Sequence, residues 1–451
     1  MTRQSRLLLW VPALALASAL APTLPSRAQF AEEDVTVLRT FEAEAPGDSF
    51  GFVSERLGDL DFDGVPELII GAPANTSGGP LAGRAYVYSG ASGELLHAIT
   101  GEAEDRLGYG VAAAGDVDAD GVQDSLVGGI GTFQAEVPFQ GRVLVISGSD
   151  HEVIHDVRGA GAFSALGYEV AGVGDLDGDG HDDFAAGAPF TSAGGMANNG
   201  RVRVFSGASG TELWASDGQF EGGFFGIGLS GLQLDVDGDG VREVVAAASG
   251  GGPEGTGVAR ILGGADGGTL RWVVPEETAS SFGWFFVHDA GDVDGDGAHD
   301  LYVGDFGDTT LGPNSGRGYV YSGRAHHRIR SGDDAAPAPT FEVARRIVSV
   351  PPRQAGEGLG IGRGAGDLDG DGRADLVLGA YTHDGPAEQG GRVYLVRGVD
   401  GTVLRTLTGT EPGAQLGFDA IVAGDADQDG VDDLLVTGVD VAYLVAGRPL
   451  P

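Results

Sequence analysis

The sequence contains no cysteine, no lysine and, after its first 24 residues, no long apolar run. Without cysteine, the chain has no disulfide framework, thiolate metal site, cysteine nucleophile or lipid-modified N-terminal cysteine. Basic residues are also scarce, because 27 arginines stand against 66 acidic residues and give a formal charge of −39. Such a surplus repels nucleic acid and anionic membrane surfaces, so neither is expected as a partner.

The first 28 residues have the composition of an export signal. Arginines at positions 3 and 6 precede an apolar run from 7 to 24, and small residues occupy positions 26 and 28. This order predicts a secretory signal peptide cleaved after Ala28. An uncleaved membrane anchor is the weaker alternative, because Pro12 and Pro22 interrupt a run barely long enough to span a bilayer. We therefore expect a secreted, periplasmic or cell-surface protein without a membrane span in its mature chain.

Two features are abundant instead: glycine, with 82 residues, and a nine-residue acidic pattern, D-x-D-x-D-G-x-x-[DE]. Asp175–Asp183 is a clear copy, and four carboxylates in each of seven copies account for 28 of the 66 acidic residues. The seven copies occupy residues 59–67, 116–124, 175–183, 235–243, 292–300, 367–375 and 425–433.

This spacing suits one hard cation in each copy. Carboxylates at positions 1, 3, 5 and 9 and the main-chain carbonyl of position 7 can converge, and glycine at position 6 permits the sharp turn. The pattern therefore predicts up to seven bound Ca²⁺ ions. The predicted ligands are Asp59, Asp61, Asp63, Val65, Glu67, Asp116, Asp118, Asp120, Val122, Asp124, Asp175, Asp177, Asp179, His181, Asp183, Asp235, Asp237, Asp239, Val241, Glu243, Asp292, Asp294, Asp296, Ala298, Asp300, Asp367, Asp369, Asp371, Arg373, Asp375, Asp425, Asp427, Asp429, Val431 and Asp433.

An EF-hand loop begins in the same way but needs a bidentate acid at position 12, inside a helix. Here position 12 is apolar in every copy, and β-like runs follow it: Ile70, Val127, Ala186, Ala246, Val303, Leu378 and Val436. The loops are therefore expected to be hairpin calcium sites. Because the clustered carboxylates repel one another without a cation, we expect calcium to act as part of the fold.

The copies are evenly spaced, with intervals of 57, 59, 60, 57, 75 and 58 residues. Each repeat contains four short β-like runs, which predicts a four-stranded antiparallel sheet that must pack against its neighbours. The expected fold is all-β: a seven-bladed β-propeller over residues 29–451. Only two runs follow the seventh loop, so segment 36–42 is predicted to complete the last blade. The long interval places an insert, 324–353, between strands 3 and 4 of blade 5, as a surface excursion or a recognition loop.

Other motifs recur in fixed order. Phe-Gly opens three repeats and Leu-Gly opens four, Gly-Ala-Pro ends two second strands at residues 71–73 and 187–189, and Gly-Arg opens five third strands. In these motifs the chain resembles the FG-GAP repeats of the integrin α-subunit N-terminal propeller and its bacterial relatives. The resemblance implies seven blades with calcium in hairpin loops on one face. It also implies that the opposite face meets partners and ligands.

Aromatic residues gather in the loops expected on that opposite face: Phe133, Phe139, Phe190, Phe220, Phe224, Phe306 and Tyr381. They either form an interaction surface or cap the interfaces between blades. Residues 284–286, Trp-Phe-Phe, are expected to be buried between blades.

Three classes of function remain open. An interaction or adhesion module for a protein or glycan ligand is favoured over an enzyme, because the chain has no phosphate-cradling P-loop and no appended catalytic domain. The alternatives are an enzyme acting on extracellular polysaccharide, with its site at the channel mouth, and a structural envelope component. No Arg-Gly-Asp sequence occurs, so integrin-like signalling is not inferred.

Overall fold

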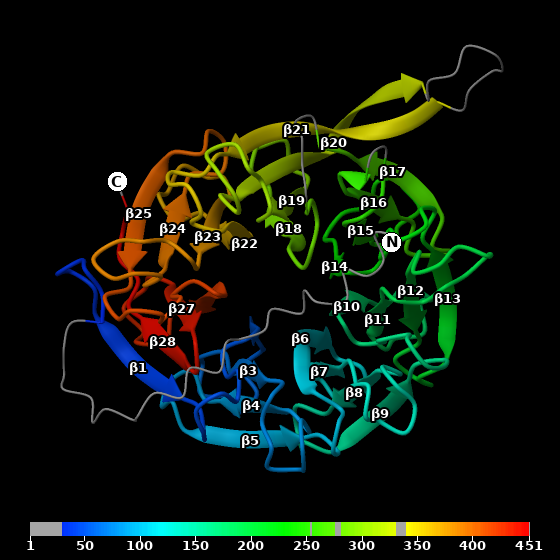
Figure 1. Ribbon diagram of the computed structural model, residues 1–451, viewed down its shortest axis with the longest axis horizontal. Helices are drawn as coiled ribbons and strands as arrows, with labels where there is room; N and C mark the ends of the chain where they lie inside the picture. Colours follow the sequence, from blue (N-terminus) through cyan, green and yellow to red (C-terminus); the bar gives the residue numbers. More distant parts are fainter. Residues whose placement is uncertain (1–28, 253–254, 276–280, 331–339, 451) are drawn as a thin grey trace.

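The structure is a computed structural model that describes residues 29–252, 255–275, 281–330 and 340–450. Seven blades surround a central axis (Figure 1), as predicted. The predicted signal peptide, residues 1–28, lies outside the described residues, as do residues 331–339 of the predicted insert. In the described part of the chain, no helix has the length and hydropathy of a membrane span.

Each blade is an antiparallel sheet whose first strand lines the axis and whose fourth strand lies outermost. Blades 1 to 4 contain β2 (Ser54–Arg56), β3 (Leu68–Ala72), β4 (Arg84–Tyr88) and β5 (Leu95–Thr100); β6 (Leu107–Gly115), β7 (Asp124–Gly129), β8 (Arg142–Ile146) and β9 (Val153–Arg158); β10 (Val170–Gly174), β11 (Asp183–Ala188), β12 (Arg201–Phe205) and β13 (Glu212–Asp217); β14 (Gly228–Gly231), β15 (Val244–Ala248), β16 (Val258–Leu262) and β17 (Thr269–Val273). Blades 5 to 7 contain β18 (Val287–Gly291), β19 (Asp300–Asp305), β20 (Arg317–Arg330) and β21 (Thr340–Val350); β22 (Leu359–Gly366), β23 (Asp375–Ala380), β24 (Arg392–Val396) and β25 (Val403–Thr408); β26 (Ala420–Gly424), β27 (Asp433–Gly438), β28 (Val441–Val445) and β1 (Val37–Glu42).

Blade 7 is closed by the N-terminal strand, as predicted. Its sheet has the order β1-β28-β27-β26, and β1 runs antiparallel to β28 with Phe41 opposite Ala442. The side chain of Phe41 is buried in a cluster that joins blades 7 and 1. The two ends of the propeller thus share one sheet, which removes an open sheet edge at the seam.

The recurrent motifs hold each blade to the next. The Phe or Leu of each opening motif is buried, and at five junctions the glycine before the third strand forms a parallel bridge with it, as Gly83 does with Leu107. Gly83 has φ +75°, and an added Cβ would lie 2.2 Å from the Leu107 nitrogen and oxygen. Glycine is therefore required there, because any side chain would separate the two blades.

Blades 4 and 5 are joined differently. Strand β21 forms a parallel pair with β17 through Trp272 and Val343, so the two blades make one eight-stranded sheet. The predicted surface excursion in blade 5 is a hairpin: β20 and β21 are 14 and 11 residues long and extend beyond the disc (Figure 1).

Candidate metal centres

The seven acidic loops all connect the first and second strands of their blades, so they lie together on one side of the disc, here called the loop face. Loop Asp175–Asp183, for example, follows β10 and ends in β11. Loops between second and third strands, and those between blades, lie on the other side, here called the opposite face.

Backbone hydrogen bonds shape each acidic loop. In Asp175–Asp183 the Gly180 nitrogen donates to Asp175 Oδ2 (2.9 Å), and the Asp179 nitrogen donates to Asp175 Oδ1 and Asp177 Oδ1 (both 3.1 Å). The position-6 bond to the first aspartate recurs in all seven loops at 2.8–3.0 Å. These bonds turn the carboxylates toward the interior of the loop.

The turn requires a left-handed backbone at two positions. The glycine at position 6 has φ between +82° and +92° in every loop. Position 4 is also left-handed, and there glycine is replaced by Phe62, Ala119 and Gln428, with φ of 61°, 60° and 59°. A non-glycine residue with such a φ is strained, so three of the seven loops are formed at an added cost.

The predicted carboxylate ligands are brought together. In each of the first five loops, ligand-capable oxygens of at least three acids lie within 4.8 Å of one another; in the first loop these are Asp59, Asp61, Asp63 and Glu67. The position-7 residues lie in the same turns, where their nitrogens donate to the position-5 carboxylate at 2.8–3.0 Å. Coordination by the position-7 carbonyls stays a prediction.

The acid at position 9 differs from the others because it is buried in every loop. Its carboxylate accepts a hydrogen bond from the nitrogen of position 2, as Asp183 does from Leu176 at 2.8 Å. Burial raises the pKa of Glu67 and Glu243 to about 7 and that of Asp183 to about 6, with nearby loop carboxylates adding to the shift. These acids are therefore costly to ionise unless a cation lies beside them.

The hydrogen bonds of the position-9 acids show whether a cation would fit the loops. In the loops that end in aspartate, such as Asp183, the second oxygen accepts from the glycine after the third strand, Gly207, at 2.8 Å. In the loops that end in glutamate, Glu67 Oε1 and Glu243 Oε2 are buried without a hydrogen-bond partner among the described residues. An unpartnered buried carboxylate oxygen is costly. A hard cation bound by the acids around it would satisfy each one, so the donor set fits Ca²⁺.

The sixth loop carries a competing cation. Asp369, at position 3, accepts from Arg397 Nε at 2.7 Å, and Arg397 Nη2 lies 2.6 Å from the same oxygen. The guanidinium already neutralises one of the four carboxylates, so this loop should bind a divalent ion less tightly than the others.

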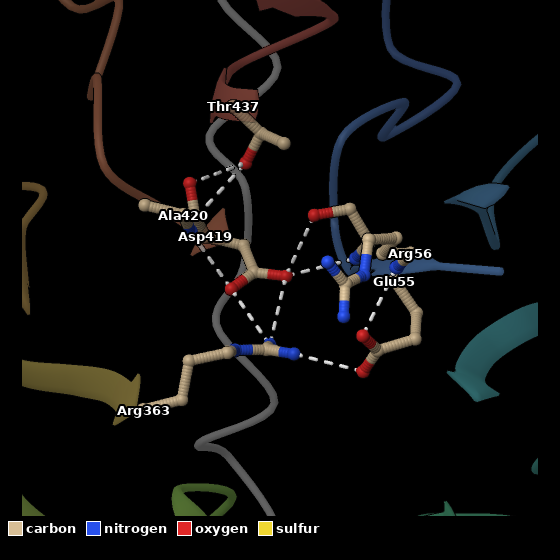
Figure 2. A network of polar contacts seen from close by, with 7 residues as sticks. Glu55, Arg56, Arg363, Asp419, Ala420 and Thr437 are labelled. Atoms are coloured by element: carbon tan, nitrogen blue, oxygen red, sulfur yellow. Dashed lines mark hydrogen bonds and ion pairs between the residues drawn. The ribbon is translucent and has the colours of Figure 1, made fainter. Parts of the chain in front are cut away.

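A second group of charged side chains lies in the central channel (Figure 2). Arg363 of β22 reaches Glu55 of β2 at 2.9 Å and Asp419 at 3.0 Å, and Asp419 accepts from the Ser54 nitrogen and hydroxyl at 2.8 and 2.9 Å. The network connects blades 6, 7 and 1. Its acids are engaged by Arg363, so their clearest role is to hold the closing blade in place.

Two further titratable groups face this network. Burial raises the pKa of Glu169 well above its ordinary value, although Arg363 opposes the shift, and burial with Arg363 lowers the pKa of His288 well below its ordinary value. Both groups therefore favour their neutral forms, and the channel carries less charge than its composition suggests.

Aromatic rings fill the channel mouth above the network. Phe285 of blade 5 lies 6.3, 6.2 and 5.1 Å, centroid to centroid, from Phe52, Tyr109 and Tyr168 of blades 1 to 3. Residues 284–286 were expected to be buried between blades, but all three are only partly buried. Phe286 packs against the cluster between blades 5 and 6, whereas the position of Phe285 contradicts the expectation. Its backbone has φ 64°, and this local irregularity directs the ring across the channel.

Two short strings match catalytic patterns that the interpretation above overlooked. His151–His155 reads H-E-x-x-H, but a zinc site of this kind needs both histidines on one helical face. Here His155 lies in β9 and bonds the Gly207 oxygen of blade 3 at 2.5 Å, whereas His151 stacks on His97 of blade 1. Gly47–Gly51 reads G-x-S-x-G, but it forms the turn before β2 and no helix follows it. Neither string has the structure that its chemistry requires.

One aromatic cluster on the opposite face is exposed. Phe133 and Phe139 come from the loop after β7, and Phe163 precedes β10. The ring centroids lie 4.6 Å apart for Phe133 and Phe139, 6.1 Å for Phe133 and Phe163, and 6.3 Å for Phe139 and Phe163. Phe133 is 56% exposed and Phe163 is 48% exposed. Phe163, in the segment between β9 and β10, was not among the predicted residues. We call these three residues the phenylalanine patch.

The other predicted aromatics pack against neighbours. Phe190 contacts Tyr168, Phe220 contacts Trp272, Phe224 contacts Phe190, Phe306 contacts Trp284 and Tyr381 contacts Phe418. For these residues the alternative interpretation, that they cap packed interfaces, describes their positions better.

Fold and motifs together define a seven-bladed propeller with an acidic hairpin loop in each blade. The FG-GAP repeat family matches residues 54–88 and 166–205, and the FG-GAP-like repeat family matches residues 367–436. The chain therefore contains FG-GAP repeats and is integrin-alpha-like.

Three relatives illustrate the similarity. Integrin alpha-5 of Xenopus laevis is 30% identical over 226 residues, which are 46% of this chain and 21% of the relative. Integrin alpha-V of Gallus gallus is 27% identical over 326 residues, which are 67% of this chain and 30% of the relative. Integrin alpha-IIb of Mus musculus is 32% identical over 214 residues, which are 44% of this chain and 20% of the relative. The chain thus spans less than a third of each relative's length.

Proposed function

We propose that this protein is an exported, calcium-binding propeller that serves as an interaction or adhesion module for a protein or glycan ligand. The integrin-like propeller supports the adhesion class, and the acidic loops with their unpartnered glutamate oxygens support calcium as a structural component. Export rests on the N-terminal sequence and stays a proposal.

The phenylalanine patch is the observation that carries the proposed binding role. Two of its three rings are about half exposed although they lie against one another, and phenylalanine loses little conformational entropy when it binds. Exposed aromatic rings of this kind stack on sugar rings or anchor the centre of a protein interface. The patch also lies on the side of the disc away from the acidic loops, so ligand binding and ion binding need not compete.

A glycan and protein array tests the proposal directly. We expect the calcium-loaded protein to retain a defined set of ligands and the Phe133→Ser/Phe163→Ser variant to lose them. The matched control is Phe62→Ser, because Phe62 is a 76% exposed phenylalanine on the loop face; this variant should bind normally. Equal loss in both variants, or no loss in the double variant, would contradict the proposed surface.

A further inference from the structure

Four pairs of neighbouring blades are joined by one recurrent contact. The third residue of an outermost strand reaches a carbonyl of the turn that follows the third strand of the next blade or, in blade 5, the carbonyl of Gly323 within β20. The contacts are His155 Nε2 to Gly207 O (2.5 Å), Trp214 Nε1 to Gly264 O (2.6 Å), Arg271 to Gly323 O, and Arg39 Nη2 to Ala91 O (2.6 Å).

Arg405 occupies the equivalent position at the junction between blades 6 and 7, which we call the seam from here on. It is the third residue of β25 and pairs with Leu395, as Trp214 pairs with Val204. The glycine that it would reach is Gly447, whose nitrogen donates to Asp433 Oδ1 at 2.7 Å, as the Gly207 nitrogen donates to Asp183 Oδ1 at 2.8 Å. The seam therefore has both members of the contact.

The contact itself is not made. In blade 7 the fourth strand is β1, so the chain after β28 does not turn into it and continues instead through residues 447–450. Arg405 is only 7% exposed, and its Nε has no hydrogen-bond partner among the described residues. Its Nη2 lies 3.9 Å from Asp34 Oδ2, an oxygen that also contacts Arg448. One carboxylate thus serves two guanidinium groups.

A cavity of about 410 Å³ lies beside this arginine, within the range of small-molecule sites, roughly 300–1,000 Å³. Arg405 and Arg448 line one part of it, Pro449 and Leu450 supply an apolar wall, and the exposed Asp432 of the seventh acidic loop supplies a carboxylate. The site therefore offers cationic donors for an anion, an acceptor for hydroxyl groups and an apolar surface for a ring.

We propose that this seam pocket binds a single uronate residue of a glycan, with the sugar carboxylate on Arg405 and Arg448 and ring hydroxyls on Asp432. The carboxylate supplies the acceptor that a backbone carbonyl supplies at four other junctions, and charge-assisted bonds from arginine to carboxylate are strong ones. The pocket lies on the loop face, away from the phenylalanine patch, so this site is independent of the proposed ligand surface.

The large negative charge of the protein does not prevent this binding. At physiological ionic strength, exposed charges are screened beyond roughly 8 Å, so a bound carboxylate responds mainly to the groups of the pocket itself. There Arg405 and Arg448 attract it, whereas Asp34, Asp367 and Asp432 oppose it and Asp369 is paired with Arg397. A long polyuronate would still be repelled by the acidic surface, which favours a single or terminal uronate. Millimolar calcium belongs in the assay, because two acidic loops form part of the wall.

Calorimetric titration with sodium galacturonate and sodium glucuronate, with galactose and glucose as neutral counterparts, tests the site. We expect the uronates to bind and the neutral sugars not to. Arg405→Met should weaken uronate binding by about tenfold or more, as expected for loss of a hydrogen bond to a charged group. Asp34→Asn should strengthen it, because the resident carboxylate no longer competes.

Arg39→Met is the matched control, since Arg39 is the third residue of β1 and its turn carbonyl is already bound; its uronate affinity should be unchanged. Circular dichroism reports whether Arg405→Met folds, and Arg448→Gln, at a half-exposed residue, provides a second variant that should bind at least about threefold more weakly. Unchanged affinity in both arginine variants overturns the site. Equal binding of acetate, of the neutral sugars or of a peptide with a free C-terminus overturns the assignment to an acidic sugar.

Discussion

The loop face and the opposite face of the disc are built from the same blades but differ in what repeats. On the loop face, the first aspartate, the left-handed glycine and the buried acid recur seven times with nearly identical hydrogen bonds. On the opposite face the loops differ in sequence, and only one blade carries the phenylalanine patch. An acidic loop that stabilises its own blade is needed in every blade, whereas a binding surface for one ligand is needed only once. Changes on the loop face should therefore cost stability, and changes on the opposite face should cost binding.

Chelation of calcium should have the largest effect. At 1 mM calcium and extracellular-type dissociation constants of about 0.1 mM, each site contributes about 1.4 kcal/mol, and seven sites approach the total stability of a typical domain. We expect excess chelator to lower the Tm by more than about 10 °C, measured by calorimetry, and calcium to restore it. Magnesium at the same concentration is the control and should restore less. An unchanged Tm after chelation would contradict the proposal that calcium in the acidic loops stabilises the fold.

The chelated protein should also depend on pH in an unusual direction. Burial raises the pKa of Glu67, Glu243 and Asp300 to about 7 and that of Asp124 to about 6. The folded state then binds more protons than the unfolded state between pH of about 4 and 7, so the free energy of unfolding falls as pH rises through this window.

We expect the Tm of the chelated protein to be higher at pH 5.5 than at pH 8.0 by several degrees, about 5 °C. Calcium should abolish or reverse the difference, because it holds the same carboxylates ionised. The Phe133→Ser/Phe163→Ser variant is the control for the other face and should show the same profile as the parent. A chelated protein that is equally stable at both pH values would contradict the assignment of these acids.

The repeat made most of the fold predictable from the sequence. An interval near 58 residues gave the number of blades, and the count of two strands after the seventh loop was enough to predict that segment 36–42 closes blade 7. The acidic loops were predictable because their ligand set is contiguous in the chain. Their burial pattern follows from position 9 being the first residue of a core strand in the loops that end in aspartate.

Features that depend on distant contacts were not predictable. Arg363 pairs with Glu55 across 308 positions and with Asp419 across 56, and no local pattern indicates either partner. The ring of Phe285 lies across the channel because of one left-handed residue, which strand alternation cannot reveal. The seam pocket exists because the fourth strand of blade 7 comes from the other end of the propeller, a consequence of topology alone.

The smallest predicted effect concerns position 4 of the acidic loops. It compares the loops on the loop face that have glycine at this position with those that do not. Phe62, with φ 61°, is highly exposed and occupies a place where four other loops have glycine. Phe62→Gly should relieve backbone strain and stabilise the protein by about 0.5–1 kcal/mol, offset in part by the greater freedom of glycine in the unfolded chain. The reciprocal control is Gly178→Ala, in a loop with φ 77°, which should destabilise by a similar amount. Urea unfolding at saturating calcium measures both. If both variants destabilised the protein, the turn conformation would not be what limits these loops.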